Sequence, residues 1–260
     1  MHVISFVTTI GRIILNFLKA AGEFALFIAK TIEGCLKPPY YPREFLKQAI
    51  EIGYYSMPVV GMTLLFAGMV FALQMYSGLS KFSAENAVAF ALVIAITREL
   101  GPVLAGLMVA GRIGASMAAE LGTMRVTEQI DALETLATNP FKYLVGPRVI
   151  AGVLMLPLLV FVGDVIGVYG GYLISVHKLD FNHATYIQNT YNFMEAMDVV
   201  SGMVKAAVFG FIITTMGCYY GYYSKGGAEG VGNATTKAVV SSSILILIVN
   251  YMMSELFFTR

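Results

Sequence analysis

Two oppositely charged residues, Arg98 and Glu99, stand side by side within a long apolar stretch of the sequence. Twelve uncharged residues at 86–97 precede this pair, and Gly101–Pro102 follows it closely. An ionisable side chain deep in a membrane-spanning segment is costly, so it requires a partner, a water-filled cavity or a function. Together with Asp164, which lies in another apolar stretch, the pair could form structural ion pairs, line a substrate cavity, or relay protons or ions.

Pro102 predicts a distortion next to this charged pair. A proline has no N–H to donate to the carbonyl four residues earlier, here that of Arg98, and its ring clashes with that carbonyl. We therefore expect a kink or break in the helix. Neighbouring residues on a helix point about 100° apart, so Arg98 and Glu99 should each find a different partner. Asp164 is one candidate.

Other sites for chemistry are not evident in the sequence. It contains no G-x-x-x-x-G-K-[ST] pattern, so the chain carries no recognisable ATP site. Cys35 and Cys218 form no C-x-x-C pair, and His2, His177 and His183 have no metal-ligand spacing. We predict no catalytic residue, metal site or cofactor, and therefore not an enzyme.

The composition indicates an integral membrane protein. Of the 260 residues, 57% are hydrophobic and only 13% are charged, whereas soluble domains carry about 25% charged residues. The net charge of +1 argues against nucleic acid as a partner.

Hydropathy predicts an all-α fold with five transmembrane helices, each able to provide the roughly 20 residues that cross a bilayer. The predicted spans are 52–76, 86–118, 149–176, 199–223 and 238–258. A glycine-rich loop at 224–237 is expected between the last two. In the third span, Gly163, Gly167 and Gly171 recur every four residues, a spacing that allows close helix packing.

The first 36 residues predict a different kind of helix. Apolar residues recur there at helical spacing, while Arg12 and Lys19 lie on the opposite side. Such a helix favours the membrane interface. We therefore divide the chain into an interfacial amphipathic helix at 1–36 and a membrane domain at 45–260.

Basic residues predict the orientation, because Lys and Arg are enriched on the cytoplasmic side. Only Lys81, Lys178 and Arg260 fall on the side opposite the N-terminus. The remaining basic residues that bear on orientation are Arg12, Lys19, Lys30, Lys37, Arg43, Lys47, Arg125, Lys142, Arg148, Lys225 and Lys237. The N-terminus is therefore predicted in the cytoplasm and the C-terminus on the opposite side of the membrane.

The polar segment between the second and third spans contains a short two-faced helix. Glu128, Asp131 and Glu134 form an acidic stripe, and Ile130 and Leu133 form an apolar stripe beside it. This pattern fits either a solvated interfacial helix or a helix that docks into a groove of a cytoplasmic partner. The predicted docking residues are Thr127, Glu128, Ile130, Asp131, Leu133 and Glu134.

The outer end of the first span carries an apolar face made of Phe71, Met75, Leu79 and Phe82. Lipid contact alone explains such a face. It gains functional meaning if two copies of the chain face each other there.

Several stretches resemble the MlaE-type permeases, the membrane subunits of MCE-associated lipid ABC transporters. The main run is ITRELGPVLAGLMVAGRIGASMAAELGTMRVTEQIDALETLATNP, followed by PRVIAGVLMLPLL, GVYGGYLI and GAEGVGNATTKAVV. The resemblance begins at about residue 45 and covers most of the remaining chain.

This resemblance implies a homodimeric permease in the bacterial inner membrane. A separate cytoplasmic ABC ATPase would dock on a coupling helix at about 123–138, with a periplasmic MCE-domain protein above and a STAS-domain protein as a further subunit. The cargo would be glycerophospholipid, moved between inner and outer membranes to maintain outer-membrane asymmetry. The resemblance places the lipid cavity at Phe71, Met75, Leu79, Phe82, Arg98 and Glu99.

Alternative functions remain open on the residues alone. Arg98, Glu99 and Asp164 would suit an ion-coupled secondary transporter, although no internal repeat is evident. Related permeases carry other lipids such as sterols, and a passive membrane scaffold is a third hypothesis.

Overall fold

The computed structural model describes residues 2–82, 84 and 87–258, and the described residues form helices without any strand. Within these residues, five helical segments are long and apolar enough to cross a membrane. They are Pro42–Phe82, Ala87–Val126, Phe141–His177, Ala196–Tyr222 and Gly227–Phe258. The predicted all-α fold with five spans is confirmed for this part of the chain.

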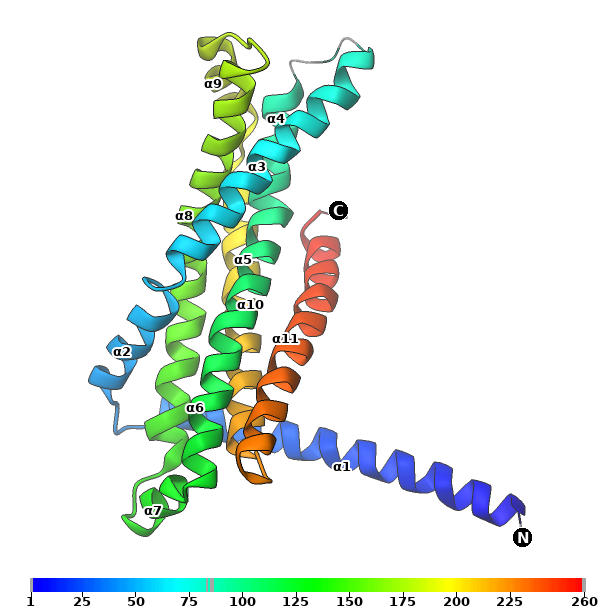
Figure 1. The fold of residues 1–260 in the computed structure, drawn as a ribbon, viewed down its shortest axis with the longest axis vertical. Coiled ribbons are helices and arrows are strands. Elements are labelled where there is room, and N and C mark those ends of the chain that lie inside the picture. Colours follow the sequence, from blue (N-terminus) through cyan, green and yellow to red (C-terminus); the bar gives the residue numbers. More distant parts are fainter. Residues whose placement is uncertain (1, 83, 85–86, 259–260) are drawn as a thin grey trace.

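Helix α1 (His2–Leu36) is separate from these spans and projects sideways from the bundle, roughly perpendicular to it (Figure 1). Leu18 and Leu26 are exposed, whereas Phe27 is buried in a cluster with residues of α8 and α10. The helix is therefore anchored at its C-terminal part, and its direction suits a helix that lies along a membrane surface.

The first span combines α2 (Pro42–Ile52), α3 (Met57–Leu79) and a 3₁₀ turn at Ser80–Phe82. The second span is a continuous rod of five pieces that includes two π-helical segments. Its pieces are α4 (Ala87–Ala95), η2 (Ile96–Leu100), α5 (Gly101–Val109), η3 (Ala110–Gly114) and α6 (Ala115–Val126). The distortion expected before Pro102 is therefore a widened turn rather than a break.

The rest of the chain contains α7 (Gln129–Thr135), π-helical η4 (Phe141–Val145) and the long α8 (Gly146–His177). The following polar connection forms α9 (His183–Phe193), which was not predicted; Asn182 accepts hydrogen bonds from its first N–H groups. Then come α10 (Ala196–Tyr222) and α11 (Gly227–Phe258). The loop predicted at 224–237 was wrong from residue 227 onward, because these small residues continue into α11.

Helix α8 packs between α3 and α10, and glycines allow this close approach. Gly163 and Gly167 lie against Leu64 of α3, and Gly171 lies against Leu92 of α4. Helices α7 and α1 lie at one end of the bundle and α9 at the other, while the end of α11 stops short of the α9 end (Figure 1).

Candidate functional site

The charged pair in the second span reaches the fourth span. Arg98 donates from Nε to Oδ1 of Asp198 at 2.6 Å, and its Nη2 lies at the same distance from that oxygen. Asp198 is fully buried in the first turn of α10, where its Oδ2 also accepts from the backbone N–H of Glu195 at 3.1 Å. The carboxylate therefore caps a helix N-terminus, where negative charge is favoured, and compensates the guanidinium.

Lys205, two turns further along α10, has no exposed side-chain surface. Its ammonium group lies 2.8 Å from Oε1 of Glu99, 2.9 Å from the carbonyl oxygen of Arg98 and 2.7 Å from Oγ of Ser254. These contacts use all three of its donors. The Arg98 carbonyl is the group that Pro102 leaves without an N–H partner, so Lys205 compensates both the Glu99 charge and the backbone defect.

Helix α11 completes the network. Oε2 of Glu99 accepts from Nδ2 of Asn250 at 2.8 Å, and Oγ of Ser254 lies 2.7 Å from Oε1 of Glu99. The ring of Phe258 covers the Arg98 guanidinium, with 4.2 Å between the guanidinium carbon and the ring centroid. Three spans therefore meet at two adjacent ion pairs, Arg98–Asp198 and Glu99–Lys205, which we call the charge network.

Asp164 does not belong to this network, so the suggestion that it partners Arg98 was wrong. It is buried in α8 and packs against Gly101, where any larger residue would overlap its carboxylate. Its Oδ1 has no hydrogen-bond partner among the described residues. The close fit requires glycine at position 101, immediately after the π-helical turn.

The apolar residues predicted to line a lipid cavity differ in their surroundings. Phe71 packs with Leu100 against a cluster that contains Ile96, and so joins α3 to the π-helical turn. Met75 and Leu79 are half-buried, and Phe82 is 81% exposed. The structure gives no direct contact between these last three residues and the charge network.

The predicted docking helix α7 is held to the bundle along one side. Ile130 is completely buried beside Leu121 and Tyr222. Asp131 pairs with Arg125 at 2.5 Å, and Glu134 accepts a hydrogen bond from the Tyr222 hydroxyl at 3.2 Å.

The other side of the α7 region is open. Thr127 and Glu128 are exposed before the helix, Leu136 is 75% exposed directly after it, and Leu133 is half-buried. Ile130 is therefore an anchor within this chain, and the surface available to a partner is Glu128, Thr135 and Leu136 together with the outer sides of Asp131 and Glu134.

Sequence reasoning missed most of the partners of the charged pair. Asp198 fell just outside the predicted fourth span, and Lys205, Asn250 and Ser254 were not among the predicted site residues. One signal was available, because Asp198 and Lys205 are seven residues apart and so share a helix face. Their charges are opposite to those of Arg98 and Glu99, in the same order along the chain.

Comparison with known proteins agrees with this architecture. A family described as Permease MlaE matches residues 45–256. The chain belongs to the MlaE permease family. A probable ABC transporter permease of Rickettsia bellii is 58% identical over 250 residues, 96% of each chain. A probable ABC transporter permease of Synechocystis is 43% identical over 216 residues, covering 83% of this chain and 82% of that one.

A third relative is named the intermembrane phospholipid transport system permease protein MlaE of Haemophilus influenzae. It is 30% identical over 262 residues, covering 98% of each chain. The present chain is thus a multi-pass ABC transporter permease of the MlaE family. The matched region contains both ion pairs and α7, whereas α1 lies before it.

Proposed function

We propose that this permease, as a homodimer, moves glycerophospholipids between the inner and outer membranes and so maintains the lipid asymmetry of the outer membrane. The name of the Haemophilus influenzae relative supports the cargo. In this proposal the chain lies in the inner membrane with its N-terminus in the cytoplasm and its C-terminus in the periplasm. A periplasmic MCE-domain protein is the second partner, and a STAS-domain subunit remains a prediction.

The main observation behind the proposal is the way α7 is attached to the helical bundle. A partner that pushes on its open side would act through Ile130 on the apolar cluster around Leu121, which belongs to the second span. That span continues without interruption to Arg98 and Glu99. We infer that a separate ABC ATPase binds ATP and Mg²⁺, docks on α7 and drives the second span, while this chain supplies no catalytic residue.

The test of docking substitutes two exposed residues, because changes at exposed positions should leave the fold intact. Glu128→Lys combined with Leu136→Asp should reduce ATPase co-purification at least about tenfold, because a hydrophobic contact and an acidic contact are both lost. Glu229→Lys, at the first turn of α11 near the same end of the bundle, is the control. Unchanged co-purification of the double variant, with an unchanged unfolding temperature, would contradict the assignment of α7.

Cargo is tested in liposomes that contain the complete complex. ATP-dependent movement of labelled glycerophospholipid should be lost in Arg98→Ala and Glu99→Ala while the ATPase stays bound. A passive scaffold would show no loss in either variant, and preferential movement of a sterol would overturn the cargo assignment.

An ion-coupled secondary transporter is the alternative that Asp164 favours, because its buried Oδ1 has no described partner. It predicts lipid movement driven by a pH gradient, without ATP, in liposomes that contain this chain alone. It also predicts that Asp164→Asn abolishes this movement. The complete pairing of Arg98 and Glu99 argues against a relay through them.

A further inference from the structure

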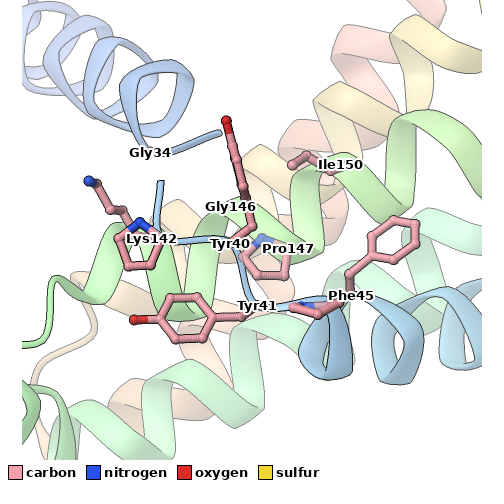
Figure 2. A pocket seen from close by; sticks show the side chains of 10 residues that line it. Gly34, Tyr40, Tyr41, Phe45, Lys142, Gly146, Pro147 and Ile150 are labelled. Carbon is pink, nitrogen blue, oxygen red and sulfur yellow. The ribbon is translucent and has the colours of Figure 1, made fainter. Parts of the chain in front are cut away.

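An apolar cavity of about 260 Å³ lies where α1 meets the bundle. Figure 2 shows the side chains around it. Tyr40 and Tyr41 come from the linker and Phe45 from α2, while Pro147 and Ile150 come from the start of α8. The lining is almost entirely apolar, although the cavity opens close to the surface.

A second cavity, of about 590 Å³, adjoins the first; its lining has charged side chains as well as apolar surface, and we call it the polar cavity. Lys30 and Glu33 of α1 line one side, and Glu134 of α7 and Asn139 line another. Both cavities share Gly34 and Lys142 as lining residues. Lys142 therefore stands at the boundary between an apolar and a polar space.

The two lysines that line these cavities have hydrogen-bond donors that are not used within the described part of the protein. The Lys142 ammonium donates to the carbonyl oxygen of Pro38 at 2.8 Å, which leaves two of its three N–H groups for other acceptors. The Lys30 ammonium lies 5.6 Å from the ring centroid of Phe141. It has no carboxylate partner among the described residues.

The two carboxylates of the polar cavity are already engaged. Glu33 is held by Lys37 at 2.7 Å, with a further weak attraction from Lys142, and Glu134 accepts from the Tyr222 hydroxyl. Lys30 and Lys142 therefore keep donors free for an anion, whereas both carboxylates of this cavity already have partners.

The apolar cavity and the polar cavity lie at successive depths relative to the membrane-spanning part of the bundle. The Pro42–Phe82 span begins beside the apolar cavity, whereas the polar cavity lies towards α7. An acyl chain, a phosphate and a polar headgroup follow the same order in a glycerophospholipid. A basic pocket next to a membrane span is the kind of site that anionic lipid headgroups occupy.

We propose that the two cavities bind one anionic glycerophospholipid of the leaflet on the α7 side. Part of an acyl chain fills the apolar cavity, and the phosphate contacts Lys142 and Lys30. The lipid would connect α1, the Pro38–Pro39 linker and the α7–α8 connection. This site is distinct from the charge network, which joins the middle of the second span to α10 and α11, and it does not depend on the transported cargo.

The test uses the full chain in phosphatidylcholine nanodiscs with a trace of phosphatidylglycerol that carries a photoreactive acyl chain. Crosslinks mapped by mass spectrometry should concentrate at residues 39–45 and 146–150. Unlabelled phosphatidylglycerol should compete at least about tenfold better than added phosphatidylcholine, as expected when two lysine–lipid attractions are specific to the anion. Equal competition, or labelling spread evenly along α3, α8 and α11, would overturn the proposal.

Three variants separate the parts of the site. Lys30→Gln with Lys142→Gln should remove the preference for the anionic lipid, and Lys19→Gln, further along α1, should keep it. Ile150→Trp fills the apolar cavity and leaves every charge in place, so it should abolish the crosslinks even if the lysine variants disturb the linker. Unchanged labelling of Ile150→Trp would contradict the acyl-chain position.

A competition with water-soluble glycerol 3-phosphate distinguishes a lipid from a free phosphate ester. It should fail to displace the photoreactive lipid, because it has no chain for the apolar cavity. Full displacement would show that the polar cavity alone binds phosphate esters, and the lipid proposal would then be wrong.

Discussion

Lys205 illustrates how a single buried cation can organise a membrane bundle. It compensates Glu99 and the carbonyl oxygen of Arg98 at the same time, and it contacts α11 through Ser254. Removal of the ammonium would leave Glu99 without a compensating charge, although Asn250 and Ser254 would still donate to it. The residue is therefore as important to the folded bundle as to any function of the charge network.

We expect Lys205→Met to lower the free energy of unfolding by about 2–4 kcal/mol. Breaking a buried ion pair typically costs about 3–5 kcal/mol, and the partial exposure of Glu99 reduces this value. Denaturant titration in detergent micelles measures the change, with the exposed Lys225→Met as control. A second substitution, Glu99→Gln, should restore part of the stability lost in Lys205→Met. Equal stability of Lys205→Met and Lys225→Met would refute the structural role of Lys205.

Glu33 provides a pH-dependent prediction outside the membrane-spanning segments. A hydrogen bond and the charge of Lys37 hold the pKa of this exposed carboxyl below its ordinary value of 4.5. Because the folded-state pKa is depressed, the pair stabilises the end of α1 at higher pH. Its contribution is lost as the pH falls through the folded-state pKa.

A carboxyl-carbon NMR titration should place the Glu33 midpoint below 4.5. Lys37→Met should shift it upward, and Lys19→Met, which removes the distant partner of Glu23, should leave it unchanged. If the Glu33 midpoint did not change in Lys37→Met, the result would contradict the pairing of Glu33 with Lys37.

At the scale of elements, the contact between α3 and α8 depends on glycine. A Cβ atom at Gly68 would overlap the carbonyl oxygen of Gly167, so the two helices cannot keep this distance with a larger residue. Backbone atoms cannot move aside as a flexible side chain can. Even one added methyl group at Gly68 should therefore disturb the interface between α3 and α8.

Gly68→Ala should destabilise the protein by about 1–3 kcal/mol through overpacking. Gly78→Ala is a matched control in the same helix, because a Cβ atom there has no neighbour within 4 Å. This control should be neutral or slightly stabilising, since alanine favours the helix. Unfolding in detergent compares the two, and equal effects would argue against close packing at Gly68.

The whole molecule has two different ends, with α1 and α7 at one and α9 at the other (Figure 1). The distribution of Lys and Arg predicts that the α7 end lies in the cytoplasm. Alkaline phosphatase inserted at Asp180 should therefore be active in a Gram-negative host, and at Thr138 inactive. Green fluorescent protein at the same positions should give the opposite result. The reverse pattern would invert the orientation, and with it the side on which an ATPase could dock.

The sequence was sufficient for the number of spans and for the separate first helix, because these features depend on local hydropathy. It was insufficient for the partners of Arg98 and Glu99, which lie about a hundred positions away in α10 and beyond. Asp164 attracted attention because it lies within a predicted span, whereas Asp198 lies at a span's edge. Capping of α10 draws Asp198 into the bundle, and hydropathy does not register such a contact.

The three π-helical segments found among the described residues share one property. Each carries a basic residue that bonds to another part of the chain: Arg98 to Asp198, Arg112 to Glu51 and Ser56, and Lys142 to Pro38. The widened turns thus coincide with tertiary connections of this molecule. Such turns often mark functional sites in helices.

These turns also constrain how the length of the chain can vary in evolution. Deleting one residue from Ile96–Leu100 would restore ordinary α-helical bonding with little rotation of α4 against α5, because a π-helical turn takes up one residue more than an α-helical turn. A deletion within the regular helix α5 would instead rotate the parts before and after it by about 100°, and Leu92 and Val109, both buried, could not then keep their neighbours at once. Single-residue deletions in the second span should therefore be tolerated better at Ile96–Leu100 or Ala110–Gly114 than in the regular helices, and a homologue that lacks one residue here should lack a π-helical turn rather than have a repacked bundle.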